Sequence, residues 1–115
     1  MRKLPFLFDG EVKEKFIVIW LSSANIVVGF EIISEGNLNS SIVHPREVFR
    51  GAIVATCANI IIAHNHPSGN PEPSREDINI TKKLVEAGKI IDVNLFYHII
   101  FAEDKYTSLL ESRLI

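Results

Sequence analysis

The sequence predicts an α/β domain in which helices pack against one mixed β-sheet, and three observations support this prediction. Short apolar runs rich in β-branched and aromatic residues, which are typical of strands, recur along the chain. Two longer stretches between such runs place apolar residues at helical spacing. The length of 115 residues suits a single domain, which would bury about two-thirds of the surface of the unfolded chain.

The first half of the chain predicts a hairpin followed by a helix. Residues 15–21 and 26–33 are rich in β-branched and aromatic residues and flank a small polar turn, so they predict two antiparallel strands. Residues 40–43 could add a short strand. Pro45 suits the first turn of a helix, whose apolar spacing continues to about residues 57–59.

The second half predicts four elements: a strand at 60–64, a helix at about 75–87 and strands at 93–102 and 106–110. The run 60–63 is wholly apolar, which indicates a buried strand. Ser74 suits the N-cap of the helix, and Gly88 is a natural stop. We expect the strand at 93–102 to have a free edge, which could pair with a substrate strand or with a second copy of the chain.

Composition and charge exclude several classes of protein. The formal net charge is −2 and no basic stripe is present, so nucleic acid is not an expected partner. The single cysteine, Cys57, rules out an intrachain disulfide and suits a reducing cytoplasm. No secretory signal or membrane-spanning run is found. We expect residues 1–13 to form an N-terminal arm and residues 14–115 to form the domain.

His64 and His66 leave the predicted buried strand together. Side chains two residues apart point to the same face of a strand, so the two imidazoles can converge. A proline-rich turn at residues 67–73 brings the chain back, and Asp77 follows in the first turn of the next helix. Two ring nitrogens and one carboxylate could hold one zinc ion with a coordination position open. The alternative is that the histidines bond to backbone and that Asp77 only caps the helix.

A carboxylate interrupts the second predicted strand. Glu31 stands within an apolar run, where a charge is costly to bury unless it is paired or close to a metal. Strand alternation puts Gly29 on the same face, which would leave room for a substrate or another chain segment. Glu31 is therefore the predicted general base. The alternative, of equal weight, is that Glu31 is an exposed residue on an outer face of the sheet.

One stretch of the sequence resembles a known signature. The pattern is His-x-His-Pro, six residues and Ser-x-x-Asp, and it resembles that of the JAMM (MPN+) metalloprotease superfamily; it stands here as His64, His66, Pro67, Ser74 and Asp77. Residues 36–49 and 63–69 are similar, more closely, to the catalytic domain of RadC-type bacterial proteins. The similarity extends from about residue 14 to residue 111.

The resemblance implies a three-layer α/β/α fold of the cytidine-deaminase type with one zinc ion per chain. It implies that Glu31 corresponds to the upstream catalytic glutamate of the superfamily and that Ser74 donates a hydrogen bond to the oxyanion. Tyr97 departs from the family, which often has aspartate directly before the histidine matched by His98.

The activity that the resemblance implies is hydrolysis of a peptide or isopeptide bond by metal-activated water. The substrate would then be a protein or a peptide. Two alternatives remain at this point: a role associated with DNA repair, which is the family's label, and a non-catalytic binding module that keeps the fold.

Overall fold

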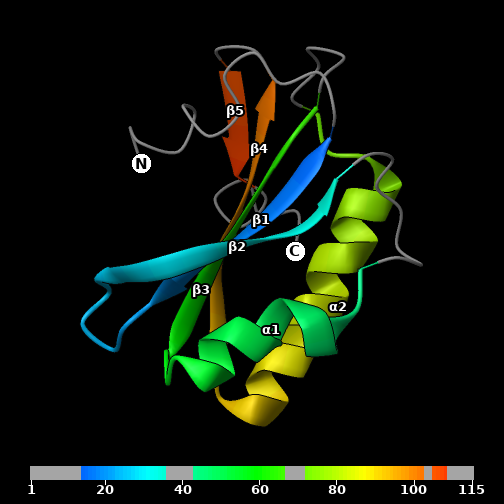
Figure 1. Cartoon of the computed structure of the whole chain (residues 1–115). Coiled ribbons are helices and arrows are strands. Elements are labelled where there is room, and N and C mark those ends of the chain that lie inside the picture. The colour runs from blue at the N-terminus through cyan, green and yellow to red at the C-terminus, as the bar shows by residue number, and fades with distance from the viewer. Residues whose placement is uncertain (1–13, 36–42, 67–71, 103–104, 109–115) are drawn as a thin grey trace.

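In the computed structural model of the chain, the described residues are 14–35, 43–66, 72–102 and 105–108. They form a five-stranded mixed sheet in the order β2-β1-β3-β4-β5 and two helices (Figure 1). The strands are β1 (Lys15–Leu21), β2 (Val27–Glu35), β3 (Asn59–Asn65), β4 (Asn94–Ala102) and β5 (Lys105–Ser108), and the helices are α1 (Pro45–Val54) and α2 (Arg75–Ile91). The predicted α/β class with a mixed sheet is confirmed.

The pairing of the strands places β3 at the centre of the sheet. β1 pairs antiparallel with β2, as the predicted hairpin requires, and also antiparallel with β3. β3 and β4 are parallel because α2 carries the chain back between them. The prediction of a free edge at residues 93–102 is wrong, since β4 also pairs with β5. The edges of the described sheet are β2 and β5.

Both described helices pack against the same face of the sheet. Their buried residues meet alternate residues of the strands in one apolar cluster, which includes Phe16, Val18, Ile60, Ile62, Val48, Phe49, Ala52, Ile80 and Leu84. The buried cluster on the opposite face contains only strand residues, among them Ile17, Ile19, Ile61 and Ile99. Within the described ranges the second helical layer of the predicted three-layer fold is not seen. None of the helices described here has the length and apolar character needed to cross a membrane.

The helix ends differ from the prediction. α1 ends at Val54 and does not reach residues 57–59. α2 continues past Gly88 to Ile91, and Asp92 takes the left-handed conformation (φ 58°) that ends it. Gly88 is buried within the helix instead of ending it.

Close packing explains the glycine at position 88. A Cβ atom there would lie 2.3 Å from the carbonyl oxygen of Val93 and 3.3 Å from Cζ of Phe49. The first distance is far shorter than any van der Waals contact, so the missing side chain lets the chain turn tightly into β4. The glycine therefore marks a close approach between two segments.

Several predictions lie wholly or partly outside the described residues. The arm at 1–13 and the strand at 40–42 are among them, whereas Val43 is described as a buried residue without strand structure. The last predicted strand is described as β5 up to Ser108, and its final two residues lie outside the described part.

Candidate metal centre

The two histidines lie where the central strand ends. His64 is the penultimate residue of β3 and is completely buried, with the ring of Phe16 stacked at a centroid distance of 5.9 Å. The backbone N–H of His66 donates to the carbonyl of Phe101 (2.7 Å), which holds the residue after the strand against β4. The Nε2 atoms of the two imidazoles are 3.1 Å apart. The structure thus brings these two predicted ligands together.

The first turn of α2 supplies a carboxylate to the same place. Asp77 Oδ1 is 3.1 Å from Nε2 of His64, and Asp77 Oδ2 is 3.1 Å from Nε2 of His66. A capping box orients this side chain: the backbone N–H of Ser74 donates to Asp77 Oδ2 (2.7 Å), and the backbone N–H of Asp77 donates to Ser74 Oγ (3.0 Å). The helix cap and the cluster therefore depend on one carboxylate.

Asp77 is ionised in this environment. Burial by itself would raise the pKa of its carboxyl group, because it disfavours the charged form. Hydrogen bonds with His64 and His66, and then the backbone N–H of Ser74, outweigh burial and hold the pKa well below the ordinary range. A buried negative charge is thus maintained beside two imidazoles, which is a suitable setting for a cation.

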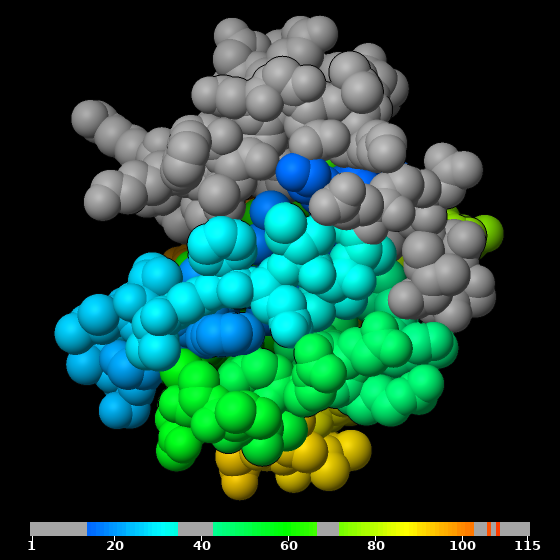
Figure 2. All heavy atoms as spheres, viewed as in Figure 1, coloured from blue at the N-terminus to red at the C-terminus, as the bar shows by residue number. Residues whose placement is uncertain are grey.

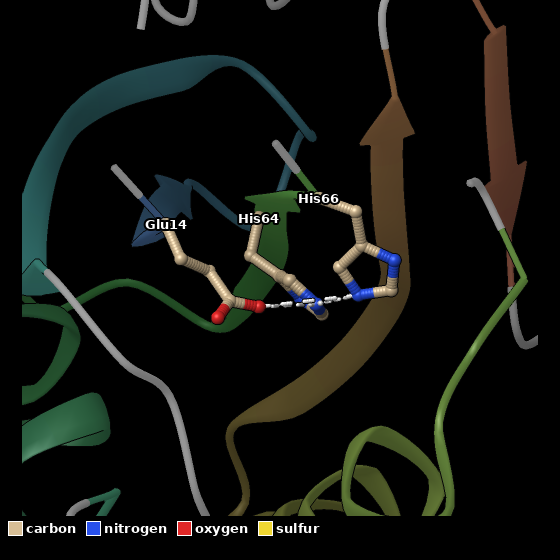
Figure 3. A group of neighbouring side chains, drawn as sticks. All are labelled: Glu14, His64 and His66. Atoms are coloured by element: carbon tan, nitrogen blue, oxygen red, sulfur yellow. Dashed lines mark hydrogen bonds and ion pairs between the residues drawn. The ribbon is translucent and has the colours of Figure 1, made fainter. Parts of the chain in front are cut away.

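A second carboxylate approaches the histidines from the start of β1. Glu14 Oε1 lies 4.0 Å from Nε2 of His64 and 3.9 Å from Nε2 of His66, and Figure 3 shows the three side chains pointing toward one another. These three residues form a group whose ligand atoms could hold a metal ion. The side chain of Glu14 is 23% exposed, so solvent can reach this side of the cluster.

Strand register explains why Glu14 is there. β1 and β3 are antiparallel with Phe16 opposite His64, so continuing the register by two residues brings Glu14 opposite His66. The backbone N–H of Lys15 donates to Oδ1 of Asn65 (2.6 Å) and secures this end of the pair. Sequence reasoning missed Glu14 because the pairing of β1 with β3 is not readable from the chain. The one signal in the sequence was that Glu14 directly precedes a predicted strand, where its carboxylate could lie at the end of the sheet.

The donor set fits zinc. Zinc bonds of about 2.0–2.2 Å in a tetrahedral site separate neighbouring ligand atoms by roughly 3.3–3.6 Å. The facing atoms of His64, His66 and Asp77 are 3.1 Å apart in each pair, close to that spacing. Glu14 stands farther from both imidazoles, at 3.9–4.0 Å, and its carboxylate is a further candidate ligand.

Glu31 is placed in a different part of the structure. It lies on the edge strand β2, and its Oε2 accepts a hydrogen bond from Nη2 of Arg50 in α1 (3.1 Å). Figure 2 shows the cyan spheres of β2 beside the green spheres of α1 on the face in view. β1 lies between β2 and the histidine strand, and two strand spacings amount to about 10 Å. The structure does not bring Glu31 into the histidine cluster.

The space predicted beside Glu31 is also filled. Gly29 lies opposite Trp20 in the sheet, and a Cβ atom at Gly29 would be 2.9 Å from Cε3 of that indole. The glycine therefore accommodates a tryptophan of the neighbouring strand and leaves no room for a substrate. The ion pair with Arg50 accounts for the charge of Glu31 within the apolar run 26–33.

Ser74 can serve as a cap and still donate a hydrogen bond. Its Oγ accepts the backbone N–H of Asp77, which occupies a lone pair and leaves the O–H available. The residue is exposed and lies three positions before Asp77, at the start of α2. The two roles predicted for Ser74 are thus compatible.

The fold and the cluster together define a class: a mixed-sheet α/β domain with a candidate metal centre of histidines and carboxylates where the central strand meets a helix. Comparison with known families specifies it further. The chain matches the RadC-like JAB domain family over residues 2–114 and belongs to that family. The resemblance to RadC-type proteins is confirmed.

Curated relatives carry the name UPF0758 protein. The chain is 52% identical to the protein from Methanosarcina mazei over 97 aligned residues. The aligned stretch covers 84% of this chain and 42% of the relative. It is 52% identical over 103 residues to that of Desulforamulus reducens (90% and 45%). For that of Clostridium beijerinckii the identity is 52% over 118 residues (99% and 52%). The chain thus spans about half the length of the relatives it matches.

Proposed function

We propose that this domain is a zinc-dependent hydrolase of peptide or isopeptide bonds. The observation that carries the proposal is the convergence of His64, His66 and Asp77, whose facing atoms are 3.1 Å apart in each pair. His64 Nε2, His66 Nε2 and a carboxylate oxygen of Asp77 would hold the ion. A bound zinc ion would supply Lewis acidity, polarising a carbonyl group and lowering the pKa of water to about 7.

Glu14 is the general base of the proposed reaction, in the place that sequence reasoning assigned to Glu31. Its carboxylate faces both Nε2 atoms from the partly exposed side of the cluster. From there it takes a proton from the attacking water and returns it to the leaving amine. Glu31 lacks this access because its carboxylate lies against Arg50.

Ser74 stabilises the oxyanion that develops on the substrate carbonyl. Its hydroxyl group is exposed beside Asp77 and can donate its proton. It also sits at the start of a helix of 17 residues, where the aligned peptide dipoles favour negative charge. A protein or peptide substrate in the cytoplasm remains our expectation, and buried Cys57 is compatible with a reducing compartment.

Metal content and turnover of matched variants test the proposal. We expect the wild type to bind one zinc ion per chain and His64→Ala to bind none. Glu14→Gln should keep the metal and lose turnover by at least 100-fold, because the amide cannot accept the proton. Glu31→Gln is the matched control and should keep both.

Zinc is measured by mass spectrometry after dialysis. Turnover is measured on a fluorogenic peptide library and on peptides that contain a lysine isopeptide bond. Equal, negligible zinc in wild type and His64→Ala would refute the metal centre. Full turnover in Glu14→Gln with loss in Glu31→Gln would return the base to Glu31.

A further inference from the structure

Two residues outside the proposed ligand set are joined to it by hydrogen bonds. His98, on β4, has its Nε2 atom 2.8 Å from Nδ1 of His64. Its other ring nitrogen, Nδ1, is in hydrogen-bond contact with Oγ1 of Thr81 on α2. The hydroxyl of Thr81 in turn donates to the backbone carbonyl of Asp77 (2.7 Å). His64, Thr81 and His98 are all completely buried.

Counting hydrogens along this chain of contacts gives each bond a direction. A hydroxyl has one proton, and that of Thr81 is donated to a carbonyl, which can only accept. Oγ1 must then accept the N–H of His98 Nδ1. Among the described residues no charged group bonds to either ring nitrogen of His98, and a fully buried imidazole in that setting is neutral.

The neutral ring of His98 has a single N–H, so its Nε2 carries a lone pair. That lone pair accepts the proton on Nδ1 of His64, 2.8 Å away. Nε2 of His64 is then the ring nitrogen that faces Asp77 Oδ1 and His66 Nε2, both at 3.1 Å. Without a metal it can hydrogen-bond to Asp77, and its lone pair would bind an ion in place of that proton. Three potential ligand atoms held this close suit a cation between them.

We propose that Thr81 and His98 form a relay that holds a proton on Nδ1 of His64, so that Nε2 is the ring nitrogen presented to a metal ion. The inference rests on the metal centre of the proposed function. Thr81 and His98 are positioning residues, because neither touches the ion or the substrate.

The relay also joins two of the proposed ligands to each other. From the carbonyl of Asp77 it passes through Thr81 and His98 to His64, which faces the carboxylate of Asp77 again. This closed ring links α2, β4 and β3. Orienting partners of this kind change metal affinity by about 10–100-fold when they are removed.

Nitrogen NMR of the metal-free protein tests the relay directly. Long-range ¹H–¹⁵N correlation spectra of histidine-labelled protein distinguish the two neutral tautomers of each imidazole. We expect a proton on Nδ1 of both His64 and His98 in the wild type. Thr81→Val removes the hydroxyl at nearly constant volume, and there the Nδ1–H form of both rings should no longer dominate. Thr81→Ser keeps the hydroxyl and should keep the wild-type spectrum.

Zinc affinity gives a second readout for the same pair of variants. Zinc affinity is measured by competition with a chromophoric chelator. We expect Thr81→Val to bind zinc about tenfold more weakly than the wild type, and the affinity of Thr81→Ser to lie within about threefold of the wild-type value. Circular dichroism establishes that each variant is folded before it is compared.

Two results would overturn the relay: an Nε2–H tautomer of His64 in the wild type, or an unchanged spectrum and affinity in folded Thr81→Val. If Thr81→Val does not fold, the wild-type spectrum still decides. If the wild type binds no zinc, the proposed function fails, whereas the tautomer of His64 in the metal-free protein is still measured.

Discussion

Asp77 caps a helix and also faces the two predicted histidine ligands, which were the two alternatives that the sequence left open. Its carboxylate accepts the backbone N–H of Ser74 and so completes the helix cap. The same two oxygens face the imidazoles of His64 and His66. A carboxylate has about four lone-pair sites, so capping and coordination do not compete for it. The hydrogen bonds that cap α2 therefore also orient the carboxylate of Asp77 toward the two histidines.

His98 makes the stability of the metal-free protein depend on pH. Burial, and then the neighbouring imidazole of His64, lower its pKa well below the ordinary 6.5. The unfolded chain therefore binds more protons than the folded one below pH 6.5. The contribution of His98 to stability is complete above that pH and is lost as the pH falls toward the folded pKa.

Urea unfolding at pH 7.5 and 5.5 measures this effect. We expect His98 to account for a loss of up to about 1.4 kcal/mol per pH unit over the range below its unfolded pKa. His98→Gln, which does not titrate, should show a correspondingly smaller loss between the two pH values. Identical losses in the two proteins would contradict the assignment.

At the element scale, the start of α2 depends on the hydroxyl of Ser74. Ser74→Ala removes the acceptor for the backbone N–H of Asp77, and we expect it to cost about 1 kcal/mol of the free energy of unfolding. Ser74→Thr keeps a capping hydroxyl and should cost less. The midpoints of urea unfolding of the metal-free proteins make the comparison, and equal stability of Ser74→Ala and the wild type would show that the cap contributes nothing.

The packing of α2 onto its neighbours depends on Gly88. Alanine has a helix propensity better by about 1 kcal/mol, so propensity alone predicts that Gly88→Ala is stabilising. The structure predicts the opposite, because the new Cβ would meet the carbonyl of Val93 at 2.3 Å. We expect a loss of about 1–3 kcal/mol, as for other overpacked sites.

Thermal unfolding of Gly88→Ala checks this expectation. Glu86→Ala lies on the same helix with an exposed side chain and serves as the control, with an expected change within about 0.5 kcal/mol. A Gly88→Ala protein with a raised melting temperature would mean that the turn into β4 can relax.

At the scale of the whole molecule, the candidate metal centre ties together distant parts of the chain. Glu14 precedes β1, His64 and His66 end β3, and Asp77 begins α2. A ligand that binds only the folded state stabilises it by mass action, by about 2.7 kcal/mol at a concentration 100 times Kd. For a domain of this size we expect saturating zinc to raise Tm by roughly 10 °C.

Differential scanning fluorimetry with EDTA or with zinc measures the shift. His64→Ala should show no rise, because it lacks a central ligand. A rise of equal size in that variant would place the stabilising zinc elsewhere on the molecule.

Much of the fold was predictable from local pattern. The apolar runs predicted β1 and the central strand β3, because burial on both faces requires apolar residues throughout. The apolar run of β2 also predicted a strand, although most of its apolar side chains are exposed. The predicted helix ends were less accurate. α2 continues past Gly88, because the glycine is needed for the close approach of Val93 to the helix, which a local pattern does not reveal.

By itself the sequence determined the α/β class, the family and the spacing of His64, His66 and Asp77, because these depend on neighbours along the chain. Only the tertiary structure decided which glutamate faces the histidines and how His98 supports His64. Glu14 reaches His66 across 52 residues of sequence through the pairing of β1 with β3, whereas Glu31 lies on an edge strand beside Arg50. Strand order and register produce such contacts, and no local pattern encodes them.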